Sequence, residues 1–305
     1  MNPNEIIFAG TAATETVENA LTLQKKVQLS VLRLDRIHPE VSGNKWFKLQ
    51  YYIRDAIDKG YSSLLTFGGP YSNHIAATAY AAKSFGLTSI GIIRGEEPSQ
   101  WSHTLVDARQ CQMQLVFLSR KEYDVAKRNL GKTLFEKQFD NAYIVPEGGY
   151  GILGVQGASK ILDTNDISSY THIVSAVGTG TTIAGLLQSS SADQQVIGIS
   201  CMKNNTGLLE EIQFLLRSPL PERFHLIHDY HFGGYARQNN RLTTFMNQFY
   251  KVSGIPLDFV YTAKMMCGVF DLIGKDFFPA RSSILAIHSG GLQGNRSLAG
   301  GILEF

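Results

Sequence analysis

The chain has 305 residues, 44% of them hydrophobic, which is enough to bury two moderate cores, and we expect two lobes. Its 28 basic and 26 acidic residues give a formal net charge of +2 and are spread along the whole length, which excludes a basic stripe for nucleic acid or anionic lipid. No apolar run approaches the ~18 to 20 residues of a membrane span, and the first ten residues lack the pattern of a signal peptide. We therefore expect a cytoplasmic protein whose partner is a small molecule.

The first half of the chain reads as one lobe of alternating strands and helices. Short apolar runs that end near glycine alternate with helical segments, which is typical of a parallel sheet covered by helices on both faces. Residues 45–152 are therefore expected to form a small domain of α/β class. The expected helices are 51–60, 74–86 and a basic helix over 121–139, and the expected strands are 62–69, 88–96, 114–120 and 141–149.

A second series of elements predicts the larger domain. Residues 27–35 are strand-like and are expected to join this series, so the large domain consists of residues 1–44 and 153–305. Residues 218–240 contain prolines and polar residues and are expected to be a loop. The other expected elements are strands over 171–178, 194–200 and 282–291 and a helix over 183–190.

The segment SGNKWFKL, residues 42–49, presents Lys45 just before a predicted helix. An amine there becomes a nucleophile when desolvation or a neighbouring charge lowers its pKa. Taken alone, the segment also fits a solvated turn. The other motifs of the chain, described below, favour the interpretation of Lys45 as a nucleophile.

A second motif places Ser72, Asn73 and His74 at the start of a predicted helix, directly after a strand and a glycine-containing turn. Ser and Asn are good N-cap residues, so simple capping explains them. The same amides and hydroxyl would also bind the carboxylate of a substrate. The two interpretations are compatible.

A third motif, GTGTT at residues 178–182, lies between a strand and a helix. Glycines allow backbone N–H groups to approach an anion, and the helix start and the threonine hydroxyls add further donors. The motif predicts a phosphate site but no nucleotide fingerprint, because Ile183 stands where a GxGxxG pattern needs glycine. The residues of this predicted site are Gly178, Thr179, Gly180, Thr181 and Thr182.

Two further motifs lie near the ends of predicted elements. Ser289 and a glycine pair end the last strand, at the edge where α/β proteins bind ligands, although a plain turn also explains them. Tyr261 and Thr262 enter a helix, where a core aromatic residue and an ordinary first-turn residue are equally good explanations.

No metal site is expected. His225, His228 and His231 recur every three residues but have no matching acidic or cysteine partner. The three cysteines are far apart and odd in number, so they suggest neither a disulfide framework nor a CxxC metal site.

With these motifs in this order, the chain resembles the pyridoxal-phosphate-dependent D-cysteine desulfhydrase and 1-aminocyclopropane-1-carboxylate deaminase family over nearly its whole length. The resemblance implies a two-domain α/β fold of the tryptophan synthase β type, fold type II, with mostly parallel twisted sheets flanked by helices. It also implies pyridoxal 5′-phosphate as cofactor and a small amino acid as substrate. A homodimer is expected, with no nucleic-acid or membrane partner.

The resemblance also assigns roles to residues of the motifs. Lys45 would carry the cofactor as a Schiff base, and Lys48 would lie near its phosphate. Ser72 would act as the nucleophile, and Asn73 would meet the phenolic oxygen of the cofactor. Residues 178–182 would hold the phosphate.

Tyr235 and Tyr261 would lie near the substrate, and Ser289 would face the ring nitrogen of the cofactor. A neutral hydroxyl there makes the cofactor a milder electron sink, which suits β-elimination. The resemblance also implies that Thr262 contacts the cofactor. In the cyclopropane-opening deaminases a glutamate and a leucine stand at the positions of Thr262 and Ser289. The resemblance therefore favours elimination from D-cysteine, giving pyruvate, ammonia and sulfide.

Two alternatives stay open at this point. One is a deaminase that opens 1-aminocyclopropane-1-carboxylate. The other is a protein that binds the cofactor or an amino acid without turnover, since cofactor motifs report occupancy more directly than catalysis.

Overall fold

The structure is a computed structural model that describes residues 11–38, 41–128, 139 and 142–305. The chain divides into two compact units. Unit 1 consists mainly of Lys45–Gly157, and unit 2 of Ala9–His38, Ser42–Asn44 and Ala158–Phe305. Each unit has its own sheet, and the expected α/β class is confirmed.

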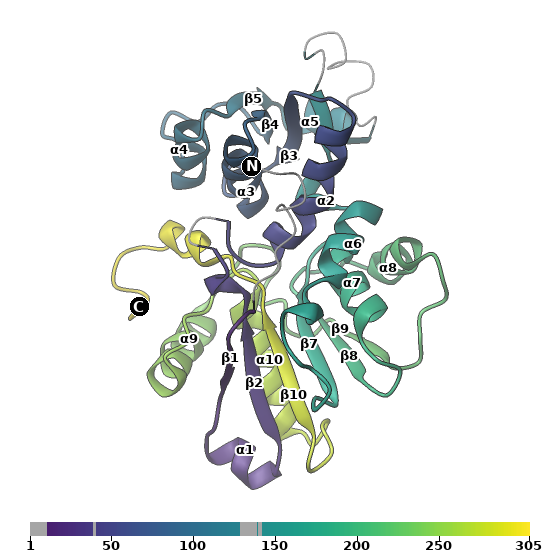
Figure 1. Cartoon of the computed structure of the whole chain (residues 1–305). Helices are drawn as coiled ribbons and strands as arrows, with labels where there is room; N and C mark the ends of the chain where they lie inside the picture. The colour runs from purple at the N-terminus through teal and green to yellow at the C-terminus, as the bar shows by residue number, and fades with distance from the viewer. Residues whose placement is uncertain (1–10, 39–40, 129–138, 140–141) are drawn as a thin grey trace. The chain divides into compact units, whose positions relative to one another are not determined.

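The sheet of unit 1 has four parallel strands in the order β5-β4-β3-β6 (Figure 1). Leu64 on β3 packs with side chains of α2 and α3, whereas Leu65 and Phe67 pack with Tyr123 of α5. Both faces of β3 are therefore covered, which explains why all six of its residues are buried. The elements are α2 (Asn44–Asp58), β3 (Ser63–Gly68), α3 (Asn73–Ser84), β4 (Thr88–Arg94), α4 (His103–Gln110), β5 (Gln114–Leu118), α5 (Arg120–Arg128), β6 (Ala142–Val145), η3 (Glu147–Gly149) and α6 (Ile152–Ser159), the last of which continues into unit 2.

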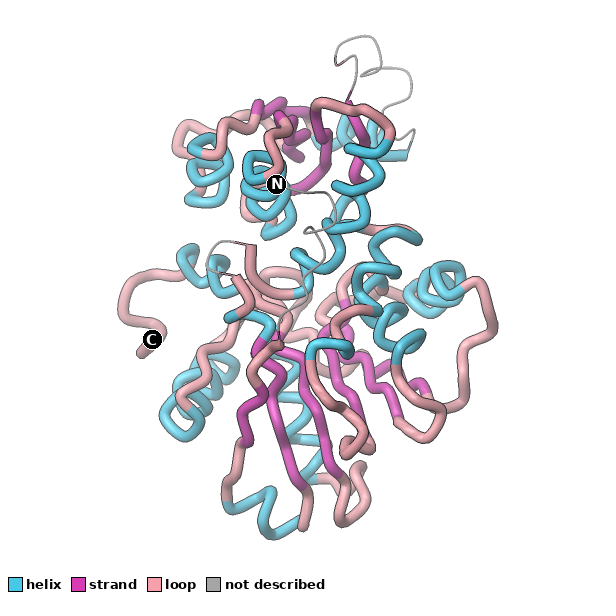
Figure 2. Tube along the Cα trace, viewed as in Figure 1, coloured by secondary structure: helices cyan, strands magenta, loops and turns pink. Residues whose placement is uncertain are grey.

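The sheet of unit 2 has six strands in the order β1-β2-β10-β7-β8-β9, all parallel except the edge strand β1 (Figure 1). Figure 2 sets these strands off from the helices and loops by colour. Alternate residues of the central strands, such as Val174 and Ile197, pack with α9 and α10 in one large core. Helix α7 also packs against β7 and β8, and α8 packs against α7. The elements are β1 (Thr14–Thr16), α1 (Ala20–Lys25), β2 (Gln28–Arg33), η2 (Leu34–Arg36), η4 (Leu162–Thr164), β7 (His172–Val177), α7 (Thr181–Ser189), β8 (Gln195–Ser200), α8 (Leu208–Leu216), β9 (Phe224–Ile227), α9 (Asn240–Ser253), α10 (Thr262–Gly274), β10 (Ser283–His288) and η5 (Leu292–Ser297).

Two sequence-based expectations differ from the structure. The predicted loop over 218–240 contains β9, a strand of four residues that pairs with β8 at the edge of the sheet; such a short run gives no strong periodic signal. Lys45 lies inside the first turn of α2 rather than before a helix. Residues 129–138, which are part of the predicted 121–139 helix, lie outside the described residues, as do residues 140–141.

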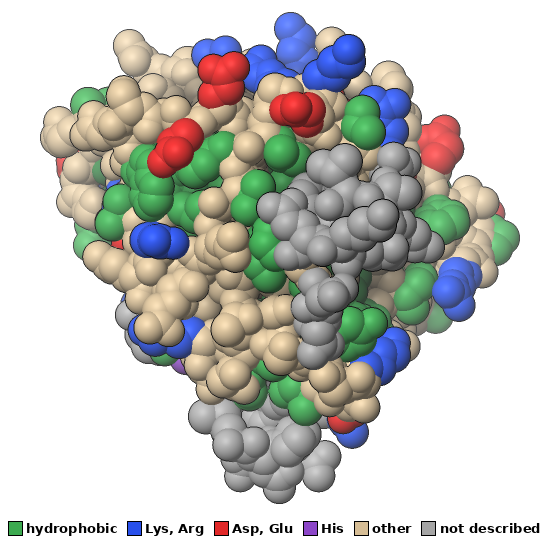
Figure 3. Space-filling view, turned by 90° about the horizontal axis from the view of Figure 1, so that it is seen from above, with side chains coloured by type: hydrophobic (Ala, Val, Ile, Leu, Met, Phe, Trp, Pro, Cys, Tyr) green, Lys and Arg blue, Asp and Glu red, His purple; other side chains and the backbone are tan. Residues whose placement is uncertain are grey.

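Acidic and basic side chains are interspersed on the face drawn in space-filling form (Figure 3). Within the described part of the chain, no helix has both the length and the apolar character needed to cross a bilayer.

Candidate functional site

The segment that leads to Lys45 is fixed in unit 2 by two backbone hydrogen bonds. The amide of Gly43 donates to the carbonyl of Leu34 at 2.7 Å, and the amide of Asn44 donates to the carbonyl of Ser289 at 3.1 Å. Gly43 has a φ of +76°, and a Cβ atom there would lie 2.0 Å from the Ser289 carbonyl oxygen. Only glycine therefore fits this approach, and the backbone is rigidly set one residue before Lys45.

Asn44 also connects this segment to the glycine-threonine loop, residues 178–182. Its side-chain amide donates a 2.9 Å hydrogen bond to the Thr182 hydroxyl, and both residues are buried. The loop and the residue that precedes Lys45 are thus held together inside unit 2.

The glycine-threonine loop has the properties of an anion cradle. Gly180, at a φ of +83°, is the N-cap of α7 and provides no side-chain cap, so the amides of the first turn are left for a ligand. The Thr179 and Thr181 hydroxyls lie 3.2 Å apart. A Cβ on Gly178 would come within 3.2 Å of the Tyr261 ring. The donors, the missing side chains and the helix start fit a phosphate group.

In unit 1, Ser72 caps helix α3. Its hydroxyl oxygen accepts hydrogen bonds from the amides of His74, at 3.2 Å, and Ile75, at 3.4 Å. Asn73 is the first residue of the helix. The capping role is real, and the Ser72 hydroxyl proton stays available because an N-cap oxygen only accepts.

The side chain of His74 is buried in unit 1. Its Nε2 lies 2.8 Å from the hydroxyl of Thr66, and the residue is 2% exposed. Burial, together with the charges of Lys45 and Lys48, lowers the pKa of His74 well below its ordinary value of 6.5. The ring is therefore neutral at neutral pH.

Lys48 is a second amine whose charge interacts with that of Lys45. It is 3% exposed, and burial and then the charge of Lys45 lower its pKa well below the ordinary value of 10.5. Lys45, Lys48 and His74 are thus close enough to influence one another's charge. Unit 1 brings together the lysine and S-N-H motifs that the sequence separates by more than twenty residues.

Unit 2 brings Tyr235 and Tyr261 together. Their ring centroids are 6.1 Å apart with an interplanar angle of 64°. Burial and the neighbouring Tyr235 raise the pKa of Tyr261 well above its ordinary value of 10, so it stays protonated and can donate a hydrogen bond. The side chain of Tyr261 is half-buried, and that of Tyr235 is exposed.

Thr262 forms its hydrogen bonds within unit 2. Its hydroxyl donates to a carboxylate oxygen of Asp258 at 2.7 Å, and its amide donates to the same oxygen at 2.8 Å. Thr262 is fully buried. The structure uses it to start α10, and Asp258 is a cap that sequence reasoning missed.

A buried charged network that includes His288, the residue before Ser289, was also missed. The guanidinium of Arg33 donates to both carboxylate oxygens of Asp35 at 2.9 and 2.7 Å, and Nδ1 of His288 lies 3.1 Å from Asp35. Nε2 of His288 lies 2.7 Å from the carbonyl oxygen of Pro256. The signal in the sequence is positional, since Asp35 and His288 stand at the carboxyl ends of parallel strands, where such residues gather.

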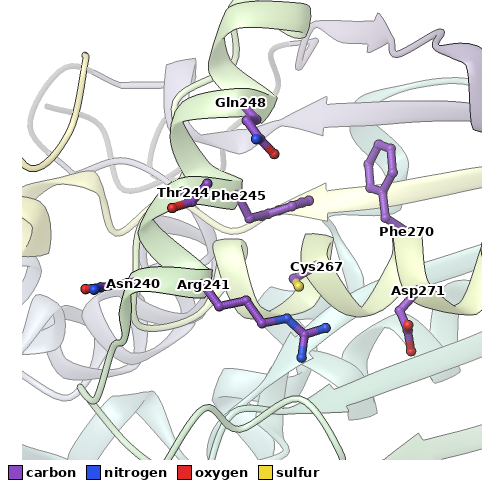
Figure 4. Close-up of a pocket in the computed structure, with 8 residues that line it drawn as sticks. All are labelled: Asn240, Arg241, Thr244, Phe245, Gln248, Cys267, Phe270 and Asp271. Carbon is purple, nitrogen blue, oxygen red and sulfur yellow. The ribbon is translucent and has the colours of Figure 1, made fainter.

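A pocket of about 550 Å³ lies elsewhere in unit 2, against α9 and α10. Figure 4 shows Arg241 and Phe245 of α9 facing Cys267 and Asp271 of α10. None of the residues predicted for the cofactor or the substrate lines it.

The model of one protein family, described as pyridoxal-phosphate dependent enzyme, matches residues 16–290. The chain belongs to this family. The cofactor expected from the sequence, pyridoxal 5′-phosphate, is thereby confirmed for the family, and an amino-acid substrate is implied.

Relatives of known name carry two related descriptions. A protein of Thermotoga maritima named "Putative 1-aminocyclopropane-1-carboxylate deaminase" is 31% identical, over 83% of this chain and 85% of that protein. The "Bifunctional D-cysteine desulfhydrase/1-aminocyclopropane-1-carboxylate deaminase, mitochondrial" of Arabidopsis thaliana is 30% identical, over 89% of this chain and 74% of that protein. The chain is thus a pyridoxal-phosphate-dependent enzyme of the deaminase and desulfhydrase group.

A solved structure described as an ACC deaminase homologue is similar over 95% of this chain and 92% of that one, with a TM-score of 0.78 and 26% identity. The structure of threonine deaminase isoform 2 from Solanum lycopersicum, at 14% identity and a TM-score of 0.66, shares the fold. The expected fold type II architecture is confirmed.

Proposed function

We propose that this enzyme eliminates the β-substituent of a small D-amino acid, with D-cysteine as the model substrate. The overall reaction consumes D-cysteine and one water and yields pyruvate, ammonia and sulfide. The observation that carries the proposal is the hydrogen bond from Asn44 to Thr182, which couples the residue before Lys45 to the phosphate cradle.

The residues of the cradle fit the cofactor. Residues 178–182 would bind its phosphate through first-turn amides and hydroxyls, and Lys45 would carry it covalently. When bound, the cofactor withdraws electrons from the α-carbon of an attached amino acid.

The chain's own residues would bind the substrate and move its proton. The amine of Lys45 would act as the general base that takes the α-proton. Ser72 and Asn73, at the start of α3, would orient the substrate carboxylate. The Ser72 hydroxyl would donate its proton to the substrate. Tyr261, held protonated by burial, is a further donor.

The choice of D-cysteine over the cyclopropane substrate rests on Ser289. A neutral hydroxyl opposite the ring nitrogen favours elimination, which needs only α-proton removal and loss of the thiol. Thr262 contributes less than its place in the sequence suggests, because its hydroxyl is bonded to Asp258. Relatives of both names support the group and leave the substrate to experiment.

The test is a panel of D- and L-amino acids with the purified enzyme, scored for keto acid, ammonia and sulfide. We expect pyruvate and sulfide from D-cysteine and little 2-oxobutanoate from 1-aminocyclopropane-1-carboxylate. Faster release of 2-oxobutanoate would make the cyclopropane deaminase the correct assignment. Bound cofactor with no ammonia from any substrate would favour a binding protein without turnover, and light scattering on the same sample tests the expected homodimer.

A further inference from the structure

Tyr235 lies in an irregular segment between β9 and α9 whose backbone conformation is unfavourable by itself. Phe232 and Ala236, which both carry side chains, have φ values of +49° and +52°. The two glycines between them, residues 233 and 234, have φ values of +92° and +116°. A left-handed backbone is unfavourable for a residue with a side chain, and it persists only where the surrounding structure imposes it. The conformation that presents Tyr235 therefore needs an anchor outside the segment.

Gly234 is the point at which this segment enters the interior of unit 2. It is buried, whereas Gly233 before it and residues 235–241 after it are exposed. Its carbonyl oxygen accepts a 2.6 Å hydrogen bond from the amine of Lys264. The amide of Arg237 also donates to this oxygen, at 3.2 Å, and closes a turn in which Tyr235 is the second residue. Lys264 thus holds the atom at which the turn that presents Tyr235 is closed.

Lys264 belongs to the helix that carries the other tyrosine. Tyr261 is the N-cap of α10, and Lys264 follows three residues later, close to one turn of helix. The backbone of Tyr261 is itself fixed, because its amide donates to a carboxylate oxygen of Asp258 at 3.0 Å. The start of α10 therefore holds Tyr261 directly and the turn of Tyr235 through Lys264, and the two ring centroids lie 6.1 Å apart.

An amine is costly at the position of Lys264. The side chain is fully buried, and its neighbours along the helix, Ala263 and Met265, belong to the apolar core. Burial of an amine is unfavourable unless its N–H groups find acceptors, and an apolar side chain of similar volume would fill the same space without this cost. The hydrogen bond to Gly234 is what the amine provides in return.

We infer that Lys264 is a positioning residue for Tyr235: by holding the Gly234 carbonyl, it sets the place of the Tyr235 phenol relative to Tyr261. This inference rests on the proposed function and on the expected place of the two tyrosines near the substrate. Lys264 acts at a distance from the reacting atoms. Its effect on turnover therefore passes through Tyr235.

A double-mutant cycle separates positioning from a general loss of stability. With an amino acid that the holoenzyme turns over, we expect Lys264→Met to lower kcat/KM about tenfold, a size typical of residues coupled through a shared backbone segment. In a Tyr235→Ala background the same substitution should change kcat/KM by less than about twofold, because the side chain that Lys264 positions is gone. Equal losses in the two backgrounds would overturn the inference.

The contact between the two rings can be followed without turnover. In holoenzyme that is deuterated except at its tyrosines, the nuclear Overhauser effect between the rings of Tyr235 and Tyr261 reports their separation, and Tyr235→Ala and Tyr261→Phe assign the signals. We expect this cross-peak in the wild type and the loss of most of its intensity in Lys264→Met. Full intensity in Lys264→Met would overturn the inference. If the cross-peak is lost but the wild type turns over no amino acid, the proposed function fails while the role of Lys264 stands.

Tyr230→Phe is the matched control. The Tyr230 hydroxyl donates to the Asp271 carboxylate at 2.6 Å, so this bond also joins the segment after β9 to α10, away from the turn at Gly234. We expect Tyr230→Phe to keep both the cross-peak and the wild-type kcat/KM. Losses as large as those of Lys264→Met would overturn the inference, since any loosening between the two elements would then be sufficient.

A second variant approaches the same bond from the side of its acceptor, in case Lys264→Met does not fold. Gly234→Ala places a Cβ atom on a residue with a φ of +116°, 3.4 Å from Cβ of Lys203, and should displace the Gly234 carbonyl. We expect it to weaken the cross-peak and to lower kcat/KM only while Tyr235 is present. A folded Gly234→Ala protein with both properties unchanged would contradict the role assigned to Lys264.

Discussion

The two units each bury a lysine and treat it differently. In unit 2, Lys264 is fully buried and donates a 2.6 Å hydrogen bond to the Gly234 carbonyl. Burial lowers its pKa, and the nearby Cys201 and Asp258 offset only part of this shift. In unit 1, Lys48 is almost as buried, but its amine donates to no described residue and a second positive charge lies nearby.

The difference separates a structural lysine from a reactive one. Lys264 is a member of α10, and its bond to Gly234 holds the loop that carries Tyr235. Its donor is used within the fold. The amine of Lys48 is left for a ligand or a neighbouring group to accept its hydrogen bonds. A buried amine with such a lowered pKa is typical of a functional site.

The first test removes the lysine to which the chemistry is assigned. Lys45→Ala should abolish covalent attachment of the cofactor and lower kcat by about 10²- to 10⁴-fold or more, since its amine is both the anchor and the proton acceptor. Borohydride reduction followed by peptide mass spectrometry locates the attachment. Lys59→Ala, an exposed substitution just after α2, is the control. A reducible bond that survives in Lys45→Ala would make Lys48 or another lysine the anchor.

Ser72 tests whether the helix start of unit 1 has more than a capping role. Ser72→Ala should lose about 1 kcal/mol of unfolding free energy as a cap and, beyond this, lower kcat on the order of 10²-fold with the cofactor still bound. Asn19→Ala removes a comparable cap, at α1, whose side chain accepts from the Thr22 amide at 2.9 Å. If both variants keep wild-type kinetics, Ser72 is a plain helix cap.

Stability measurements should separate the two lysines. Lys264→Met leaves the Gly234 carbonyl without its donor, so we expect the free energy of unfolding to fall by about 1–3 kcal/mol. Lys48→Met removes a buried amine without breaking such a bond and should cost nothing or raise stability. Urea unfolding of both apo variants under one set of conditions makes the comparison. Equal losses would contradict the distinction between them.

Much of the site follows from local sequence patterns. Lys45, Ser72 and residues 178–182 each stand where a strand or turn meets a helix, and the residue types required there are visible within a few positions. The order of α/β elements follows from the alternating apolar runs. These features depend on interactions between near neighbours in the chain.

The parts that sequence reasoning missed depend on pairing between distant strands. Thr66 meets Val145 because β3 and β6 are paired in register, and Asp35 meets His288 because β2 and β10 are neighbours. No local motif encodes such a register. The hydrogen bond from Thr66 to Val145 and the charged network of Asp35 and His288 therefore required the fold.

The smallest effect is the pH dependence of stability that Lys48 imposes. Its pKa in the folded chain lies well below 10.5, so between the folded value and 10.5 the unfolded chain binds the proton more tightly. Stability then rises with pH through this window, and the full penalty is present only below the folded pKa. Lys48→Met removes that penalty, so its advantage in unfolding free energy over the wild type should be greatest at low pH and vanish as the pH approaches 10.5. Urea titrations of both apo proteins at several pH values, with Lys59→Met as the exposed control, measure this difference. An advantage that stays constant with pH would mean that the Lys48 amine is as easily protonated in the folded chain as in the unfolded one.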